Sequence, residues 1–490
     1  MHRLYIFLLV VILVNLSGCT KDFDTINTDP DRPVEVPPTN VLAFCERFGS
    51  YSLFGLTESI YELSTYCGYV SQISYPERSY YSYFSADNDN SWTSLYQLVA
   101  NLKDIQHNNQ SSRNLQAASI ILECNVWQIA TDRYGDIPYS EACQLDDGIV
   151  QPAYDCQKDI YHSLLERLDS ACMMLSPDGG EIGCGDLMLG GDILKWRCYA
   201  TSLCLRMAAR IACADPTLSQ AVFSKVLSHP DRYPLPESNL QNVFFDSWGR
   251  EYGDPWAALY AVRSQDVGIS KLIVDILKSL DDPRLPVYAD PTPNYLAGIS
   301  TDPYVGHPIG LETTANTSAC SLIGERFTHK SNQSGFSPWL RSCEPYFAIA
   351  YAASKGFETQ GFTQQSAYEK AVSLSLDENG LSSNEIDDYL TQGGSYNGTL
   401  EQLVTQWWIS LFKNPDEGWS LFRMTGMPVG IVIAPCSVYH KNQHNTVPMA
   451  LPYPDTEANL NHDHYSQHAG VEVDHYWGKQ MWWDTRTGIY

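Results

Sequence analysis

The sequence is poor in positive charge and lacks the short motifs that identify most enzymes. Its 490 residues include 57 Asp and Glu against 31 Lys and Arg, a formal net charge of −26. This balance argues against binding to nucleic acid or to anionic membrane surfaces. The chain has no G-x-S-x-G, H-E-x-x-H, Walker A or G-x-G-x-x-G motif, so the common signs of hydrolysis, zinc proteolysis and nucleotide binding are missing.

The cysteines lack the spacing of a metal or redox motif. There are 14 of them and no C-x-x-C pair, which removes the zinc-knuckle and thioredoxin-like interpretations. Several fall within helical patterns (Cys124, Cys198, Cys204 and Cys213), where a free thiol behaves as a small apolar residue. We expect most of them to be buried free thiols. One or two disulfides are the alternative if the chain is exported to an oxidising compartment.

No apolar run is long enough to span a bilayer. The longest, Leu4 to Leu16, has little more than half of the ~20 residues that a spanning helix needs, and therefore reads as the core of a signal peptide. Leu16-Ser17-Gly18-Cys19 then matches the lipobox of bacterial lipoproteins. We predict a signal peptide at 1–18, lipidation of Cys19 and an extended linker at 19–40, so that the membrane is reached by a lipid anchor only.

Two further interpretations attach to this stretch. An ordinary signal peptide with a chance cysteine is the alternative to the lipobox. The acidic segment directly behind Cys19, residues 21–24, resembles signals that send lipoproteins to the cell surface. We therefore expect an outer-membrane protein that faces the cell exterior.

Helical periodicity dominates the rest of the chain. It predicts helices at 41–71, 92–105, 116–134, 159–175, 192–213, 218–227, 268–280, 343–357, 363–376, 400–412 and 416–424. Recurring helical hairpins of about 35–45 residues predict a mainly α, TPR-like scaffold. We expect one domain from 41 to 490, with a loop-rich insert at about 229–342 that carries the ligand site and an irregular tail at about 425–490.

The stretch from Thr131 to Ala142 is expected to be scaffold. Gly135 can take a positive φ and end the preceding helix, and Pro138 prevents the helix from resuming. Asp132 and Asp136 are suited to bond the backbone amides of this turn.

Two segments could hold a metal, each with a plainer alternative. His462 and His464 would share one face of an extended segment, as a chelate needs, with His468, Asp474 and His475 nearby. The alternative is a polar surface loop. Asp87 and Asp89, with Asn88 and Asn90 between and after them, offer oxygen ligands for Ca²⁺. This run lacks the Gly and the terminal Glu of an EF-hand. We therefore expect no cofactor, and a structural Ca²⁺ at this run is the alternative.

A series of motifs in a fixed order resembles the SusD/RagB family of outer-membrane lipoproteins, in its SusD-like subgroup. The motifs are the lipobox with Phe23, Asn27, Thr28, Asp29 and Pro30; Trp92-x-x-Leu95-Tyr96 with Asn101; Thr131-Asp132-x-Tyr134-Gly135-Asp136-Ile137-Pro138-Tyr139-x-Glu141-Ala142; Lys195-Trp196 with Leu203-x-Leu205-Arg206-x-Ala208-x-Arg210-Ile211; Gln406-Trp407-x-x-Ser410-Leu411-Phe412; and Trp419-x-x-Phe422-Arg423-x-Thr425-Gly426-x-Pro428. Met424 departs from the pattern, because the subgroup usually carries a further Arg there.

The resemblance implies a nutrient-binding protein and no catalysis. Such a protein captures a glycan or oligosaccharide, closes over a SusC-like TonB-dependent transporter and delivers the ligand to it; a peptide ligand stays open. The alternative is a surface-anchored hydrolase whose active site is built by the loops of 229–342.

The resemblance also implies that the ligand is recognised between the first helix and the helix opened by Trp92. The candidate contacts there are Tyr75, Arg78, Tyr80, Tyr81, Tyr83 and Asn90. Tyr rings stack on sugars or peptides and Arg makes forked hydrogen bonds. The alternative is that these tyrosines pack the loop onto the helices.

Replacement of Cys19 by Ala tests the lipid anchor. Cys19→Ala removes the only thiol at the processing site, so the variant should remain as an unprocessed or soluble precursor that takes up no labelled palmitate. Fractionation and palmitate labelling of both proteins measure this. A variant that still labels and still sediments with the outer membrane would contradict the lipobox interpretation.

Overall fold

The computed structural model describes residues 36–74, 76–81, 84–249, 253–311, 316–329, 335–431, 444–468 and 477–489. For residues 56–58, Arg78 and Tyr80 only the backbone is described. Cys19 lies outside these ranges. No helix in the described part of the chain combines the length and the apolar character needed to cross a bilayer.

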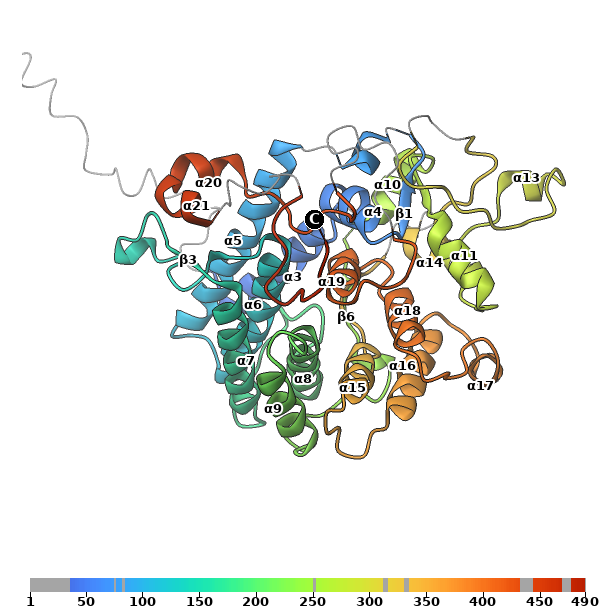
Figure 1. The fold of residues 1–490 in the computed structure, drawn as a ribbon. Coiled ribbons are helices and arrows are strands. Elements are labelled where there is room, and N and C mark those ends of the chain that lie inside the picture. Colours follow the sequence, from blue (N-terminus) through green and yellow to red (C-terminus); the bar gives the residue numbers. More distant parts are fainter. Residues whose placement is uncertain are drawn as a thin grey trace, which may run out of the picture.

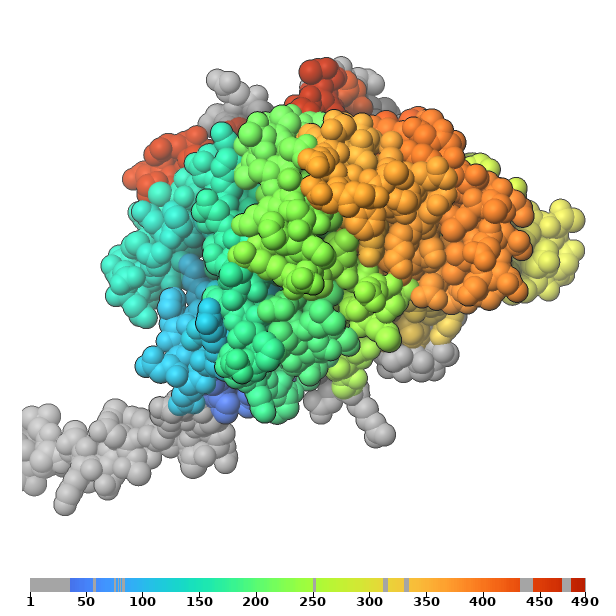
Figure 2. Space-filling model, turned by 90° about the horizontal axis from the view of Figure 1, so that it is seen from below, coloured from blue at the N-terminus to red at the C-terminus, as the bar shows by residue number. Residues whose placement is uncertain are grey.

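The scaffold is mainly α and TPR-like. Its first half contains α3 (Pro38–Leu53), α5 (Ser85–His107), α6 (Arg113–Tyr134), α7 (Gln157–Met174), α8 (Ile193–Arg210) and α9 (Pro216–Leu227). Its second half contains α15 (Glu344–Ser354), α16 (Gln364–Glu378), α17 (Ser383–Thr391), α18 (Leu400–Ser410) and α19 (Pro415–Thr425). Helices α7 to α9 and α15 to α18 lie along one edge of the molecule (Figure 1), and viewed from below these two groups cover its underside (Figure 2).

The helix starts follow from local sequence. Ser112 Oγ accepts from the amide of Leu115, and Asp192 caps α8 in the same way. Asp215 and Asn414 each cap a helix that has proline at its first position. A side-chain oxygen satisfies an amide that has no partner within the helix, and proline has no such amide to lose.

The predicted helix at 41–71 is interrupted, and the predicted loop after it is shorter than expected. Helix α3 ends at Leu53, and a π-helix (η1, Leu56–Leu63) and one short turn (α4, Ser64–Tyr66) follow. Gly55 has an extended backbone that separates α3 from η1. A 3₁₀ turn (η2, Pro76–Tyr80) occupies the expected loop, and α5 begins at Ser85 rather than at Trp92, with Asp87 favourably placed in its first turn.

Short strands tie the segment 229–342 to the scaffold. The described residues form three two-stranded sheets. They pair β1 (Val70–Gln72) with β5 (Val267–Ile269), β2 (Ile137–Pro138) with β3 (Tyr154–Asp155), and β4 (Val243–Phe245) with β6 (Ser337–Leu340), all antiparallel. Segment 229–342 also holds the 3₁₀ turn η4 (Asn239–Gln241) and the helices α10 (Pro255–Arg263), α11 (Lys271–Ser279), α12 (Leu285–Tyr288), α13 (Pro293–Leu296) and α14 (Glu325–Thr328). Outside this segment, the remaining elements are η3 (Leu145–Asp147), α20 (Asp455–Leu460) and α21 (His462–His468).

A buried network of charged side chains joins α8, α15 and α19. Arg206 Nη2 lies 2.7 Å from Glu344 Oε2, and Arg206 Nη1 lies 3.5 Å from Glu417 Oε1. Arg210 Nη2 donates to the other oxygen of Glu417. All four side chains are at most 6% exposed, so each charge is compensated by a partner and not by water.

The network continues into α6. Arg133 makes a two-pronged contact with Asp416, through Nε at 2.6 Å and Nη2 at 2.9 Å. Asp132 Oδ1 accepts from Tyr161 Oη at 2.7 Å and from Trp483 Nε1 at 2.9 Å. The motif residues that are far apart in the sequence therefore meet in one buried cluster.

The turn after α6 has the geometry that was predicted at Gly135, but its carboxylates have other partners than predicted. Gly135 has φ +84° and its amide closes the helix on the Thr131 carbonyl at 2.8 Å. Asp136 Oδ1 accepts from the amide of Gln157 at 2.8 Å. Both carboxylates were predicted to bond the amides of the turn. Asp132 instead belongs to the buried network, and Asp136 instead bonds the first residue of α7.

The cysteines agree with the free-thiol prediction. All twelve cysteines among the described residues are free. Eight of them are buried and four are exposed. Burial raises the pKa of the thiols at Cys45 and Cys124 to about 12, which leaves them protonated and inert.

Helix α3 is fixed against the rest of the molecule on two sides. Trp339 of β6 donates from Nε1 to Ser50 Oγ at 2.8 Å, and a Cβ added at Gly49 would lie 2.9 Å from the same indole ring. Glu46 Oε2 accepts from the amides of Leu187 and Met188, at 2.7 and 3.1 Å. These contacts make α3 a rigid platform.

Gly135→Val tests the turn. A β-branched residue at φ +84° is strained, so the free energy of unfolding should fall by about 1–3 kcal/mol in urea titrations. Gly249→Val is the control, because its φ is not in the left-handed range and an added Cβ meets no atom of the described residues within 4 Å. Equal losses in the two variants would remove the backbone explanation.

Glu46→Gln tests the platform through pH. Burial, followed by the nearby charge of Asp186, raises the pKa of the Glu46 carboxyl well above 4.5. A raised folded-state pKa contributes stability that is complete below the unfolded value and is lost as pH rises towards the folded value. The melting temperature of Glu46→Gln should therefore gain on that of the wild type as pH rises from about 4.5. A difference between the two proteins that stays constant with pH would show that Glu46 does not titrate in this way.

Candidate functional site

One face of α3 carries an aromatic stripe that reaches solvent. Phe44, Arg47, Phe48 and Tyr51 follow the spacing i, i+3, i+4 and i+7, which places side chains on one side of a helix. The Phe44 and Phe48 rings stack with their centroids 5.2 Å apart. Phe44 is 41% exposed and Tyr51 53%. An apolar stripe normally marks the buried face of a helix, and here the core contacts come from the other face.

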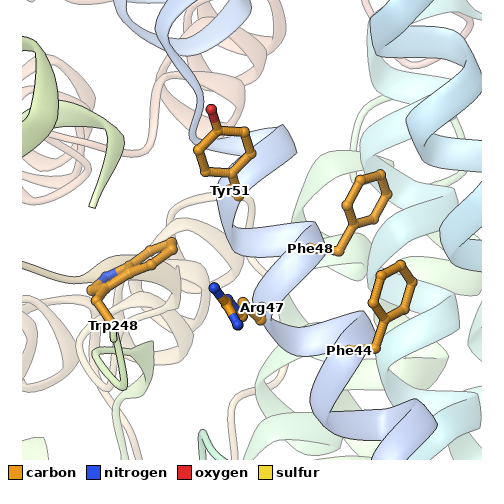
Figure 3. A pocket seen from close by; sticks show the side chains of 5 residues that line it. All are labelled: Phe44, Arg47, Phe48, Tyr51 and Trp248. Atoms are coloured by element: carbon orange, nitrogen blue, oxygen red, sulfur yellow. The ribbon is translucent and has the colours of Figure 1, made fainter. Parts of the chain in front are cut away.

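Trp248 stands opposite this stripe. Figure 3 shows Arg47 and Tyr51 on the side of α3 nearer to Trp248, with the Phe44 and Phe48 rings on the side turned away from it. The Trp248 ring packs edge-on against Phe245 of β4, with centroids 4.7 Å apart. Since β4 pairs with β6, and β6 also contacts α3 through Trp339, both walls are held by one sheet.

These five residues line a hollow of about 400 Å³, which we name the α3 cleft. Its size is that of a small-ligand site. Aromatic rings offer flat faces for stacking, and Arg47 offers donors in a fixed fork. The described lining therefore offers ring faces for stacking and hydrogen-bond donors.

Tyr81 is the only candidate tyrosine of the predicted ligand loop whose side chain lies in the described part of the structure, and its ring is buried. Tyr75 and Tyr83 lie outside the described residues, and only the backbone is described for Arg78 and Tyr80. Tyr81 is 4% exposed and packs edge-on against Tyr66 and Trp477. Tyr81 therefore packs the loop onto the rest of the molecule, which was the alternative to ligand binding. Its ring would have to leave the core to touch a ligand.

The acidic run before Trp92 is helical and is not a loop. Asp87 and Asp89 belong to the first turns of α5, and the exposed Asn90 follows them. Asp89 Oδ1 accepts from Thr456 Oγ1 at 3.1 Å, and Asn88 donates to the Pro452 carbonyl at 2.6 Å. Their side chains bind the C-terminal segment to α5.

The proposed histidine chelate is also corrected. His462 and His464 lie in α21 and not in an extended segment, so their side chains point about 200° apart around the helix axis. His468 instead contacts Asp136 at 3.3 Å and stacks on Tyr154. Asp474 and His475 lie outside the described residues. Among the described residues, no group of three or more His, Cys, Asp or Glu is placed to hold a metal.

The sequence reasoning missed the α3 cleft. The signal for one wall was present, because Phe44, Arg47, Phe48 and Tyr51 have strict helical spacing. Periodicity by itself assigns such a stripe to the core, since most amphipathic helices bury it. Trp248 is almost 200 positions further along the chain, and no local pattern links it to α3.

Comparison with solved structures shows the same fold in other proteins. A chitin-binding protein shares 26% identity over 92% of this chain and 100% of its own, with a TM-score of 0.78. A SusD-like protein from Bacteroides thetaiotaomicron shares 22% over 93% of this chain and 100% of its own, with a TM-score of 0.77. A chitin-binding SusD homolog from Flavobacterium johnsoniae shares 21% over 92% of this chain and 98% of its own, at 0.76. A comparison with curated protein sequences found no match.

The sequence also matches a family model over most of its length. The matched residues are 50–454, and the family is described as starch-binding and associating with the outer membrane. The match includes the motif residues Asp132, Arg206 and Arg210, whose side chains belong to the buried network. The chain therefore belongs to the SusD-like family.

Proposed function

We propose that this protein is a lipid-anchored receptor on the cell surface that binds glycans and delivers them to a SusC-like TonB-dependent transporter. Family membership supports a nutrient-binding role, and the relative with 26% identity carries the description chitin-binding. The lipobox at Cys19 supports the anchor. Ligand capture, and not bond cleavage, is the activity that we assign.

The observation that carries the glycan proposal is the exposed aromatic cleft on a rigid helix. Tyr51 and Trp248 present ring faces from two separate elements, with Arg47 on the same side of α3. The C–H faces of a sugar ring stack on such rings, while its hydroxyls and ring oxygen accept hydrogen bonds. Because α3 is already fixed by Trp339 and Glu46, little conformational freedom has to be lost on binding.

This proposal moves the main site away from the loop that the sequence suggested. Tyr81, the candidate tyrosine of that loop whose side chain is described, is part of the core. The α3 cleft instead has Tyr51 half-exposed and unused by packing. We therefore assign ligand stacking to Tyr51 and Trp248.

Alanine substitutions at Tyr51 and Trp248 test the proposal. Each should weaken glycan binding by ~1–3 kcal/mol, the range for the loss of a stacked aromatic anchor. Calorimetry and affinity electrophoresis with chitin, starch and other oligosaccharides provide the measurement. Tyr295→Ala is the matched control, since Tyr295 is a 41% exposed tyrosine on α13, outside the cleft.

The same samples distinguish binding from hydrolysis. Chromatography of the oligosaccharides after incubation should show no shortened products. Unchanged affinity in both cleft variants, with melting temperatures near that of the wild type, would remove the cleft as the glycan site. Release of products by the wild type would support the hydrolase alternative.

A further inference from the structure

A second hollow, which we name the α11–α18 pocket, lies between α11, α18 and the loop that follows α17. Its volume is about 440 Å³, again the size of a small-ligand site. In Figure 1 these three helices lie on the right of the view, whereas α3 lies left of centre. The pocket is therefore separate from the α3 cleft. Its polar lining includes Gln392, Ser395, Asn397, Glu401, Gln402 and Thr405.

The floor of this pocket is fixed by a buried ion pair. Arg284 Nη2 lies 2.6 Å from Asp282 Oδ2, and both side chains are fully buried. Arg284 also donates to Gln406 Oε1, and Gln406 Nε2 donates to Tyr389 Oη at 2.8 Å. Gln406 belongs to α18 and Tyr389 to α17, while the ion pair follows α11 in the chain. The three walls are therefore held together before a ligand arrives.

The loop that forms the outer wall is held by its own side chains. Gln402 Oε1 accepts from the amide of Asn397 at 2.8 Å, and Gln402 Nε2 donates to the Ser395 carbonyl at 2.7 Å. Gly393 lies against the end of α11, since a Cβ there would be 1.9 Å from the Leu280 carbonyl oxygen. A loop fixed in this way loses little conformational freedom when it binds a ligand.

Several polar groups of the lining are available to a ligand. In the described part of the structure, the side chains of Gln392, Glu401 and Thr405 bond no other residue. Gln392 and Glu401 are exposed, and Thr405 is half-buried. They offer a carboxylate that accepts, and a carboxamide and a hydroxyl that each both donate and accept.

Donors and acceptors side by side match the hydroxyl groups of a neutral sugar. Each sugar hydroxyl can donate once and accept at its oxygen, so two neighbouring hydroxyls can pair with one carboxamide or one carboxylate. The charge of Glu401 strengthens the bonds that it accepts and repels anionic ligands. Ile276, Leu280 and Pro428 add apolar surface, against which the C–H face of a sugar ring can pack.

We propose that the α11–α18 pocket is a second glycan site, which binds a neutral oligosaccharide through hydrogen bonds from its hydroxyls to Glu401, Gln392 and Thr405. This inference rests on the proposed function and adds a second point of attachment to it. The two sites differ in chemistry, because the α3 cleft offers aromatic rings for stacking and the pocket offers hydrogen bonds.

Hydrogen exchange of the full lipoprotein in detergent tests where the ligand binds. Chitin oligomers and malto-oligosaccharides are the neutral ligands, and amide exchange of residues 391–402 is measured with and without each of them. We expect at least one of these ligands to slow exchange in this segment. The same protection should appear in Trp248→Ala, because the pocket does not use the α3 cleft.

Variants in the Trp248→Ala background assign the binding to the pocket. Glu401→Gln should weaken the remaining binding about ten-fold in calorimetry, and Thr405→Val about five-fold, because each loses a hydrogen bond to the ligand. Glu166→Gln is the matched control, since Glu166 is an exposed glutamate on α7, outside the pocket. Melting temperatures should stay near that of Trp248→Ala, since Glu401 and Thr405 bond no other described side chain.

The outcomes separate this inference from the proposed function. Binding at the α3 cleft without protection of residues 391–402 would overturn the second site and leave the proposed function intact. Protection that survives Glu401→Gln combined with Thr405→Val would overturn the assignment of these residues to the ligand. A protein that binds no glycan at all would overturn both proposals.

Discussion

The buried carboxylate of Glu417 is the constraint on which the scaffold depends. Arg206 and Arg210, one turn apart on α8, both contact it, and Arg206 also pairs with Glu344 on α15. A buried charge that loses its partner is strongly destabilising, by about 3–5 kcal/mol. Helices α8, α15 and α19 can therefore pack in one register only, because a shift of one turn would leave these ions without partners. The network accounts for specificity of packing, while the apolar core supplies the larger part of the stability.

One short sheet, β4 paired with β6, positions both walls of the α3 cleft on that scaffold. Strand β6 immediately precedes α15, and Trp339 on this strand fixes α3 through Ser50. Strand β4, its partner, carries Phe245, against which Trp248 packs. Tyr51 and Trp248 are thus positioned from a common base although they come from distant segments. A binding site built on paired elements keeps its rings in place before a ligand arrives, which reduces the entropy lost on binding.

Local sequence patterns predicted much of the helical scaffold and less of its irregular parts. Helical periodicity and capping residues located α6, α7, α9 and α16 to within a few residues, because such signals act over three or four positions. The same patterns gave one helix at 41–71 where Gly55 divides it, and missed α10 and α17. Asp87 and Asp89 were assigned to a loop because four polar residues in a row carry no periodicity, although they are good first-turn residues.

The sequence by itself determined the fold class, the positive φ of Gly135 and the free state of most thiols, since each depends on residue type and near neighbours. Only the tertiary structure decided which aromatic side chains are available to a ligand. Tyr81 and Tyr51 look equally suitable in the sequence, yet one is 4% and the other 53% exposed. The difference arises because Tyr66 and Trp477 close over Tyr81, whereas Tyr51 faces Trp248 across a hollow. Exposure is a property of what distant segments cover, and no local pattern contains it.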